Sequence, residues 1–454
     1  MGVHKKIIPP ISVVAYTGNA WESPLATLRI VGPLQQAGIT LIKGNEGQDI
    51  YPERVTQADL VIVQREFPRN EATYHQIVTQ ARAQGKPVVY DLDDLLLALP
   101  ENHPDRLSHY YTEALIPMMR AITEVDAVTT CAQPLCEALR SFNPSIWLLP
   151  NYIDDRLWTM RDHKENTAGS APVIIGYMGG DSHAPDVEMI APALTYILEK
   201  YGTGVLLRFY GLRPMPGLVN KHNVEWIPLS EYNYAKFAEY FAAQECDIYI
   251  APLQDNLFNR CKSSIKFLEY SASATPGVYS RISPYEEVIR QGENGFLASN
   301  LQEWEAYLSQ LIEAPELRVG MGLQAQQTVK EDWLLSEHAG KWLETYLSIC
   351  SQQVAPKEGL IPELKIYLGI AQQVESFNKF EREEMDQTIQ ALTQRASQAE
   401  GALLQVNARL GELERSKTWK LAQFFRRCRF WLFPKGSRRE RLGIRTIEAL
   451  RGRR

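Results

Sequence analysis

Three features that often reveal location or chemistry are missing from this sequence: a membrane-spanning run, a signal peptide and a paired-cysteine motif. None of the 454 residues falls in an apolar run of roughly 18 residues, so we expect no membrane span. Residues 1–10 contain lysines but no apolar core, which predicts a cytoplasmic protein without a signal peptide. The six cysteines are scattered, and the spacing of Cys131 and Cys136 fits neither a zinc site nor a redox motif. We therefore expect reduced structural thiols.

Charge is nearly balanced over the whole chain, with a formal net charge of -6, so nothing global favours a nucleic-acid partner. Residues 417–454 depart from this balance because they contain 13 Lys and Arg but only two acids, Glu440 and Glu448. Residues 417–433 mix these basic side chains with Trp and Phe, a composition typical of helices lying on anionic lipid. We predict peripheral contact with the inner membrane face and no nucleic acid. A nucleic-acid site and a disordered tail are the alternatives.

The first 158 residues alternate short β-branched runs with amphipathic patterns, which predicts βαβ units around a parallel sheet. The expected strands are 11–17, 39–43, 60–64, 87–91, 127–130 and 146–149, and the expected helices are 25–37, 71–84 and 134–140. We interpret this region as one doubly wound, Rossmann-like domain.

The same alternation resumes over residues 171–350, after a polar linker at 159–170. The expected strands are 173–177, 205–210, 224–227, 246–252 and 277–280, and the expected helices are 186–200, 234–244 and 263–272. The predicted fold class is therefore α/β, with two Rossmann-like domains facing across a cleft. Such sheets bind ligands at the carboxyl ends of their strands.

Residues 351–416 have a helical pattern of another kind. Their apolar residues recur at alternating steps of four and three, which predicts a coiled coil that self-associates through residues 385–413. The residues in this pattern are Met385, Ile389, Leu392, Ala396, Ala399, Leu403, Val406, Leu410 and Leu413. A single amphipathic helix folding back on the globular body is the alternative.

A glycine-rich segment, Gly176-Tyr-Met-Gly-Gly-Asp-Ser-His183, lies between a predicted strand and a predicted helix. Gly179 and Gly180 would let the backbone approach an anion, and the helix that follows would offer unpaired N–H groups to a diphosphate. The spacing matches neither the dinucleotide fingerprint nor a Walker A loop. A tight turn without a ligand is the alternative interpretation.

Basic residues gather around the start of the helix predicted at 263–272. Arg260, Lys262 and Lys266 oppose the helix dipole unless an anion binds there, and such a conflict is typical of a functional site. Glu269 follows Lys266 by one turn and could accept hydrogen bonds from sugar hydroxyls. A surface Lys–Glu pair is the alternative.

Acidic residues close the strand predicted at 87–91, in the segment Tyr90-Asp-Leu-Asp-Asp94. Three interpretations stay open: a divalent metal site, a base or orienting group for an acceptor hydroxyl, and capping of the next helix. We take Asp94 and His103 as the candidate catalytic residues.

Several motifs in order resemble those of bacterial GT-B glycosyltransferases, the glycosyl transferases group 1 and family 4 enzymes. They are Pro150-Asn-Tyr-Ile-Asp154, the segment from Lys262 to Glu269, Ala274-Thr-Pro-Gly-Val-Tyr-Ser280 and the Asn294-Gly-Phe-Leu297 turn. The resemblance covers roughly residues 11–350 and is more specific in the second domain. It implies that the second domain binds a nucleotide-sugar donor and the first binds a glycan or lipid-linked acceptor.

The resemblance also implies roles for particular residues. Glu269 matches the second glutamate of the family's E-x7-E motif, which binds the donor ribose, whereas Cys261 stands where the first glutamate would be. The family's Arg and Lys for the diphosphate fall on a glycine and on His183. We predict that Arg260, Lys262 and Lys266 supply the missing positive charge. Enzymes of this kind need no metal or other cofactor and transfer with retention of anomeric configuration.

We therefore predict a glycosyltransferase of bacterial surface-polysaccharide synthesis. The missing first glutamate leaves a second hypothesis, a catalytically degenerate scaffold that acts through its coiled coil in a synthesis complex. A third is a metal-dependent enzyme that uses Asp91 to Asp94 and is disfavoured by the second α/β domain.

Overall fold

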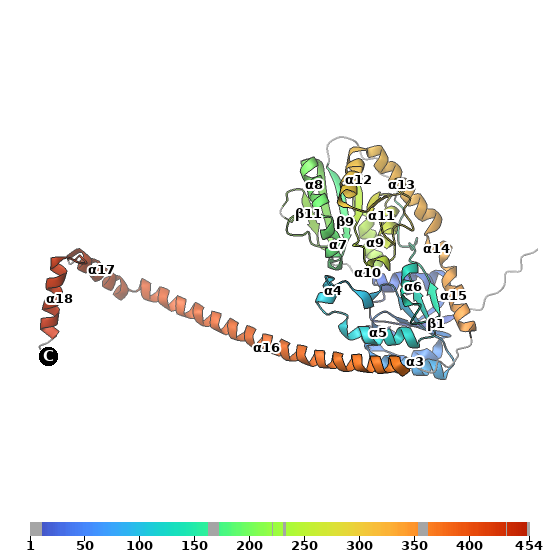
Figure 1. The fold of residues 1–454 in the computed structure, drawn as a ribbon, viewed down its shortest axis with the longest axis horizontal. Coiled ribbons are helices and arrows are strands. Elements are labelled where there is room, and N and C mark those ends of the chain that lie inside the picture. Colours follow the sequence, from blue (N-terminus) through green and yellow to red (C-terminus); the bar gives the residue numbers. More distant parts are fainter. Residues whose placement is uncertain are drawn as a thin grey trace, which may run out of the picture. The chain divides into compact units, whose positions relative to one another are not determined.

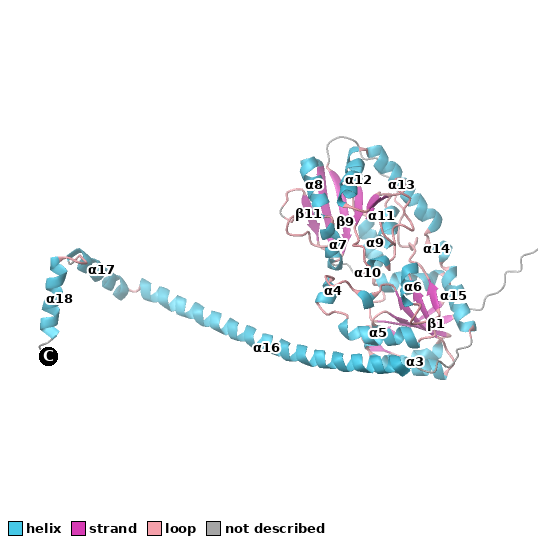
Figure 2. Ribbon diagram, in the orientation of Figure 1, coloured by secondary structure: helices cyan, strands magenta, loops and turns pink. Residues whose placement is uncertain are grey.

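The computed structural model describes residues 11–161, 172–219, 221–229, 233–352, 362–432 and 434–451. The chain divides into two compact units, one up to Ala371 and a helical one from Gln372. Two Rossmann-like domains make up the first unit, each a parallel sheet covered by helices (Figure 1, Figure 2). Residues 1–10, which carried the signal-peptide prediction, and most of the predicted linker lie outside the described residues.

The first domain has a six-stranded parallel sheet with strand order β2-β1-β5-β6-β7-β8. Its strands are β1 (Ser12–Thr17), β2 (Thr40–Lys43), β5 (Leu60–Gln64), β6 (Val88–Leu92), β7 (Ala127–Thr130) and β8 (Ile146–Leu148). Successive residues face opposite layers, so Val13 belongs to one hydrophobic cluster and Val14 to the other. Because both faces are covered, the central strands are continuously apolar. A small hairpin joins β3 (Asn45–Glu46) and β4 (Asp49–Ile50).

The second domain has a six-stranded parallel sheet with strand order β11-β10-β9-β12-β13-β14. Its strands are β9 (Val173–Gly179), β10 (Val205–Gly211), β11 (Val224–Ile227), β12 (Ile248–Ala251), β13 (Gly277–Ser280) and β14 (Phe296–Ala298). Chain order reverses between β9 and β12, the point at which doubly wound sheets open a crevice.

Helices cover both faces of each sheet. In the first domain they are α1 (Pro24–Ala26), the π turn η1 (Thr27–Val31), α2 (Gly32–Gln36), α3 (Glu71–Ala83), α4 (Pro104–Leu107), α5 (Thr112–Glu124) and α6 (Gln133–Leu139). In the second they are α7 (Ala184–Met189), α8 (Ala191–Tyr201), α9 (Tyr234–Ala242), α10 (Leu257–Arg260), α11 (Ile265–Ala272), α12 (Leu301–Glu313) and α13 (Pro315–Asp332).

All the predicted strands are present, with ends displaced by at most two residues. Two helix predictions need correction. The helix predicted at 186–200 breaks at Ile190, because Pro192 near the start of α8 cannot donate a backbone hydrogen bond to the preceding turn. The helix predicted at 263–272 begins only at Ile265, so Lys262 lies before it.

The chain passes between the two domains twice, and the two passages pair with each other. The backbone N–H of Ile153 donates to the carbonyl oxygen of Trp333 at 3.0 Å, and that of Leu335 donates to Ile153 at 2.8 Å. After the second passage come α14 (Leu335–His338) and α15 (Gly340–Ser351), which lies beside the first domain (Figure 1). Trp342 of α15 belongs to a hydrophobic cluster of the first domain. The end of the predicted second domain thus belongs to the core of the first.

The second unit consists of helices. They are α16 (Pro362–Arg415), which begins before the unit boundary, α17 (Lys417–Leu432) and α18 (Arg438–Arg451). No helix in the described part of the chain is both long and apolar enough to cross a membrane.

Candidate active site between the two domains

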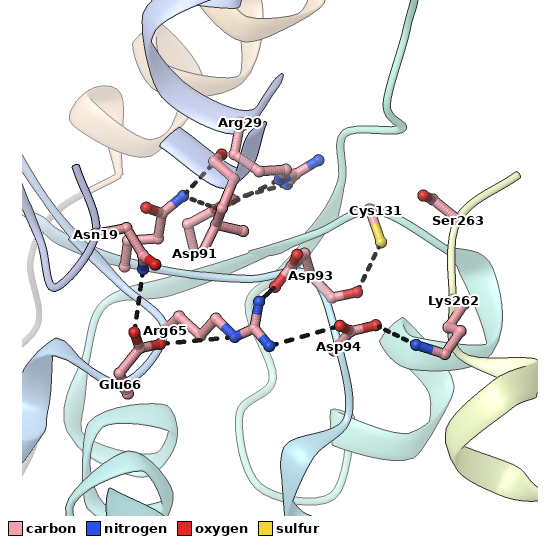
Figure 3. A network of polar contacts seen from close by, with 12 residues as sticks. Asn19, Arg29, Arg65, Glu66, Asp91, Asp93, Asp94, Cys131, Lys262 and Ser263 are labelled. Atoms are coloured by element: carbon pink, nitrogen blue, oxygen red, sulfur yellow. Dashed lines mark hydrogen bonds and ion pairs between the residues drawn. The ribbon is translucent and has the colours of Figure 1, made fainter. Parts of the chain in front are cut away.

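Polar side chains follow four strands of the first sheet at its carboxyl edge. Asn19 lies just beyond β1, Arg65 and Glu66 follow β5, Asp93 and Asp94 follow β6, and Cys131 follows β7 (Figure 3). Because parallel strands end at the same edge, these residues come together although they are far apart in the sequence. Figure 3 shows them linked into one polar network.

Asp91 is the structural anchor of this edge. Arg29 contacts both carboxylate oxygens, with Nη2–Oδ1 at 2.7 Å and Nε–Oδ2 at 3.2 Å, and the Thr129 hydroxyl donates to Oδ1 at 2.8 Å. The Arg29 and Asp91 side chains are only 1% and 3% exposed. Asp91 is therefore already engaged and is not free to act as a metal ligand, which weakens the interpretation of Asp91 to Asp94 as a metal site. Among the described residues, no group of three His, Cys, Asp or Glu is arranged to hold a metal ion.

Arg65 lies among three carboxylates. Its guanidinium nitrogens are 3.6 Å from Glu66, 3.5 Å from Asp93 and 3.7 Å from Asp94. These distances are too long for good hydrogen bonds, and Nε of Arg65, Oε2 of Glu66 and Oδ1 of Asp93 are buried without a hydrogen-bond partner. Arg65 also has φ of 47°, which is uncommon for a residue other than glycine. The carboxyl edge of the first sheet thus has hydrogen-bonding capacity to spare.

Asp93 and Asp94 differ in ionisation although they are adjacent. Burial raises the pKa of Asp93 to about 6, against the opposing charge of Arg65. Burial also opposes the charge on Asp94, but Lys262 and Arg65 together hold the pKa of that carboxyl below its usual value. At neutral pH Asp94 is therefore an ionised group already paired with cations, which makes it a poor proton acceptor.

Lys262 connects the two domains. Its Nζ lies 3.6 Å from Asp94 and 4.2 Å from the ring centroid of Phe258. Nearby, the Asn151 amide donates to the Ser263 hydroxyl at 3.0 Å. Phe258 and Cys261 belong to the buried hydrophobic cluster of the first domain. The segment around α10 is therefore docked on the first domain, and the buried Cys261 occupies the place of the family's first glutamate.

Lys266 lies at the glycine-rich end of β9, so these two predicted parts of the site are neighbours. Its Nζ donates to the Met178 carbonyl at 2.7 Å and is 5.2 Å from the ring centroid of Tyr177. A Cβ added at Gly179 would lie 2.8 Å from this Nζ, whereas one added at Gly180 would meet nothing within 4 Å. Gly179 therefore permits the close approach of Lys266, and Gly180 leaves open space beside it.

Glu269 lies on α11 one turn beyond Lys266. The Tyr234 hydroxyl, at the start of α9, donates to Oε1 of Glu269 at 2.9 Å. Burial raises the pKa of Glu269 to about 7 and lowers the pKa of Lys266 to about 8, and each charge partly offsets the shift of the other. Both charges are thus incompletely compensated in this structure.

His183 cannot replace the positive charge of the family's lysine. Its Nδ1 lies 2.9 Å from Oδ2 of Asp186, and burial lowers the pKa of the imidazole to about 4 despite this contact. It is therefore neutral at physiological pH. The two short helical segments that follow Gly180 also offer less of a helix dipole than the predicted helix at 186–200.

Two other predicted site residues have different surroundings. Arg260 is exposed and pairs with Asp255 at 2.6 and 2.8 Å, so the structure does not bring it together with Lys262 and Lys266. His103 caps α4, because its Nδ1 accepts from the backbone N–H of Asp105 at 3.2 Å. Burial lowers the pKa of His103. Its catalytic role stays a prediction, and its observed contact is structural.

A cavity of about 380 Å³ lies between the domains. Trp21, Glu22 and Lys43 of the first domain line it, together with Asn233 and Ala235 of the second. Tyr234, which binds Glu269, lies between these last two residues in the sequence. Both domains therefore line this cavity, but Asp94, Lys266 and Glu269 are not among its lining residues.

Arg65, Glu66 and Tyr234 belong to the candidate site but were not predicted from the sequence. Arg65 and Glu66 could have been found by the rule that found Asp94, because they are charged residues directly after a buried strand. No sequence pattern links Tyr234 to Glu269, since they lie on different helices.

Residues 172–314 match the family model described as glycosyl transferases group 1. No curated protein matches the sequence.

Solved structures with similar folds include three that this chain matches over most of its length. A glycosyltransferase from Rickettsia africae ESF-5 is 12% identical, with 76% of this chain and 100% of that chain covered and a TM-score of 0.51. A sucrose-phosphate synthase from Thermosynechococcus elongatus is 13% identical, with 75% and 99% covered and a TM-score of 0.51. Anabaena HepE in complex with UDP-glucose is 15% identical, with 74% and 99% covered and a TM-score of 0.51.

These identities are low enough that the likeness concerns the fold. The family match adds that the second domain, which contains Gly179, Lys266 and Glu269, has the sequence features of group 1. The resemblance inferred from the sequence is therefore confirmed: this chain has the fold of the GT-B glycosyltransferases, and its second domain matches glycosyl transferases group 1.

Proposed function

We propose that the chain is a glycosyltransferase that moves a sugar from a nucleotide-sugar donor to a glycan or lipid-linked acceptor in bacterial surface-polysaccharide synthesis. The second domain holds the donor and the first holds the acceptor. One observation carries the proposal: the ammonium group of Lys266 lies against Gly179, next to the open space at Gly180. A diphosphate there would supply the negative charge that Lys266 lacks.

The proposed reaction breaks the bond between the sugar and the diphosphate, so negative charge grows on the leaving group. Lys266 stabilises that charge, and Lys262 adds to the positive potential. Glu269 accepts hydrogen bonds from the ribose, as the family resemblance implies. In the first domain, the side chains of Glu66 and Asp93, which are 15% and 17% exposed, orient the acceptor hydroxyl. Arg260 and His183 take no part in charge stabilisation.

The test compares three lysine variants of the full chain. UDP-glucose is the first donor to try, because the Anabaena HepE structure contains it. Lys266→Met should lower donor turnover by about 10²–10³-fold, the usual cost of removing a preorganised charge from a transition state. Lys266→Arg should retain part of the activity, and Lys236→Met, at an exposed lysine of α9, should retain all of it. Unchanged turnover in Lys266→Met would contradict the proposal.

Metal independence and retention of configuration are further parts of the proposal. Both rest on the family resemblance, and the pairing of Asp91 with Arg29 is consistent with the first. Activity should be unchanged in EDTA, and NMR of the product should show the anomeric configuration of the donor. A requirement for Mg²⁺ or an inverted product would show that this part is wrong.

A catalytically inactive scaffold is the second candidate, and the buried Cys261 in place of a family glutamate favours it. A panel of nucleotide sugars distinguishes the two functions. An enzyme should hydrolyse at least one donor slowly without an acceptor, and Lys266→Met should abolish that hydrolysis. A scaffold should hydrolyse none, in wild type and variant alike.

We also propose that α17 lies on the inner membrane face, close to a lipid-linked acceptor. One face of this helix is apolar because its residues follow helical spacing, and several are more than half exposed. The face consists of Leu421, Phe424, Phe425, Cys428, Trp431 and Leu432. Arg427 and Arg429 flank it on opposite sides, the arrangement of a helix lying in an anionic lipid interface.

Phe424 and Phe430 provide a matched test of this orientation. Both are exposed, at 61% and 52%, but only Phe424 belongs to the apolar face. Phe424→Ser should weaken co-sedimentation with vesicles of anionic phospholipid several-fold, whereas Phe430→Ser should have a smaller effect. Equal binding by both variants would contradict the orientation, and equal binding after deletion of residues 417–454 would exclude the membrane role.

A further inference from the structure

Helix α16 presents a continuous apolar stripe to solvent, which we name the seam. It comprises Met385, Ile389, Leu392, Ala396, Ala399, Leu403, Val406, Leu410 and Leu413. Its seven larger side chains are 54–61% exposed. An apolar surface of this length is unusual on a soluble helix unless another chain or element covers it.

The spacing of the seam indicates what covers it. Alternating steps of three and four residues give a period of 3.5, which keeps the seam facing a partner helix only if two helices supercoil. The seam covers the a and d positions of each heptad and nothing more, since the e and g positions beside it are polar, charged or alanine. A helix packed on a globular body needs a wider apolar face than this. The seam therefore favours a second helix of the same kind.

The flanking charges determine the relative direction of the two helices. At the described e positions the charged residues are Asp386 and Glu400, and at the described g positions they are Arg395 and Arg409. An antiparallel pair places e beside e and g beside g, so no antiparallel register brings these opposite charges together. A parallel pair in register places Arg395 at g beside Glu400 at e of the other chain.

Neither Arg395 nor Glu400 has an oppositely charged residue at pairing distance on its own helix. The residues four positions from Arg395 are Ala391 and Ala399, and those four positions from Glu400 are Ala396 and Leu404. Pairing along one helix joins residues three or four apart, so Arg395 and Glu400 are wrongly spaced to pair within a chain. Their complementarity is therefore available to a second chain.

We propose that α16 binds a second copy of this chain through the seam, as a parallel, in-register, two-stranded coiled coil. It extends over about 42 Å, the rise of 29 helical residues. Because the helices are parallel, the two copies of α17 follow at the same end of the coiled coil. The proposal is independent of the glycosyltransferase activity, since it uses no residue of the first unit.

Adjacent leucines provide a matched test of the seam. Leu403 belongs to it, whereas Leu404 is the next residue, outside the seam and 71% exposed. In sedimentation of the full chain, Leu403→Asp should raise the dimer dissociation constant at least ~100-fold, because it buries an unpaired carboxylate. Leu404→Asp should leave the dimer intact. A wild-type chain that is monomeric at tens of micromolar, or a trimer, would overturn the proposal.

A charge-swap set tests the direction. Arg395→Glu and Glu400→Arg should each weaken the homodimer by about 5–10-fold, because attraction becomes repulsion at two symmetric places. Mixing the two variants should restore a heterodimer of wild-type affinity, and the double variant should restore the homodimer. If neither swap weakens the dimer, or if the mixture shows no preference for heterodimers, the parallel register is wrong.

Discussion

The carboxyl edges of the two sheets differ in how completely their charged side chains are paired with opposite charges. At the first, each of the cations Arg29, Arg65 and Lys262 forms an ion pair with at least one of the four carboxylates Glu66, Asp91, Asp93 and Asp94, so every cation there has a counter-charge. At the second, the Lys266 ammonium donates to a carbonyl oxygen, its charge is only partly offset by Glu269, and His183 is neutral. The first edge can therefore hold its shape without a ligand, whereas the second retains a cation that an anionic ligand would stabilise.

This difference separates structural charges from functional ones. A buried charge with several close partners contributes to stability, and its loss leaves a partner without compensation. A buried charged group whose pKa has been moved from its ordinary value by desolvation is better suited to bind a ligand of opposite charge. Three single-residue experiments and one double-mutant cycle test this distinction.

The largest expected effect is a loss of folding stability when the charge of Asp91 is removed. Asp91→Asn leaves the guanidinium of Arg29 buried without a counter-charge, so the free energy of unfolding should fall by about 3–5 kcal/mol. Urea denaturation measures it. Asp255→Asn is the matched control, because its partner Arg260 is exposed, and no measurable change is expected there. Similar losses in the two variants would remove the distinction between the edges.

The next effect is on the pH dependence of donor binding. Since burial lowers the pKa of Lys266 to about 8, its charge disappears above that pH, and affinity for a nucleoside diphosphate should then fall about tenfold per pH unit. Calorimetry between pH 7 and 10 would show this fall. Lys266→Arg should flatten the profile, because arginine stays protonated. A flat wild-type profile would place the diphosphate elsewhere.

Glu269 should make stability depend on pH in the opposite sense to an ordinary paired carboxylate. Its pKa is raised from 4.5 to about 7 by burial, so between these values the folded chain binds more protons than the unfolded chain. Stability should therefore fall as pH rises from about 4.5 to 7, by on the order of 1 kcal/mol after coupling to Lys266 is allowed for. Thermal unfolding measured across this pH range should show a smaller fall in stability for Glu269→Gln than for the wild type. Identical pH dependence in the two proteins would contradict a raised pKa at Glu269.

The smallest effect is expected at the contact between the domains. Lys262 and Asp94 are 16% and 21% exposed, and their 3.6 Å separation is longer than a charge-assisted hydrogen bond, so their attraction is weak. A double-mutant cycle with Lys262→Met and Asp94→Asn should give a coupling of about 0.5–1 kcal/mol in unfolding. A coupling near zero would mean that apolar packing of Phe258 and Cys261 alone holds this contact.

Much of the fold could be predicted because strands of a two-sided parallel sheet are continuous β-branched runs. Residues 60–64 are such a run, and the observed strand has the same limits. The helices α5, α12 and α13 were not predicted; Pro117 lies within α5, and α13 lacks a clear apolar stripe. The interruption at Ile190 was missed although Pro192 is a visible signal.

The site was only partly predictable, since adjacent acids in the sequence have different partners. Nothing in Tyr90-Asp-Leu-Asp-Asp94 indicates that Asp91 pairs with Arg29, that one oxygen of Asp93 lacks a hydrogen bond and that Asp94 contacts Lys262. Likewise, Arg260, Lys262 and Lys266 form one basic cluster in the sequence but have three separate environments in space.

The sequence by itself determined the two parallel sheets, the likeness of the second domain to group 1 and the heptad pattern of α16, because periodicity and local motifs depend on neighbouring residues. Tertiary structure alone decided which charges are compensated. That choice depends on burial and on partners brought from distant segments, such as Arg29 to Asp91 and Lys266 to the end of β9. Since desolvation and Coulomb attraction act through space, no local pattern could have separated the structural charges from those left for a ligand.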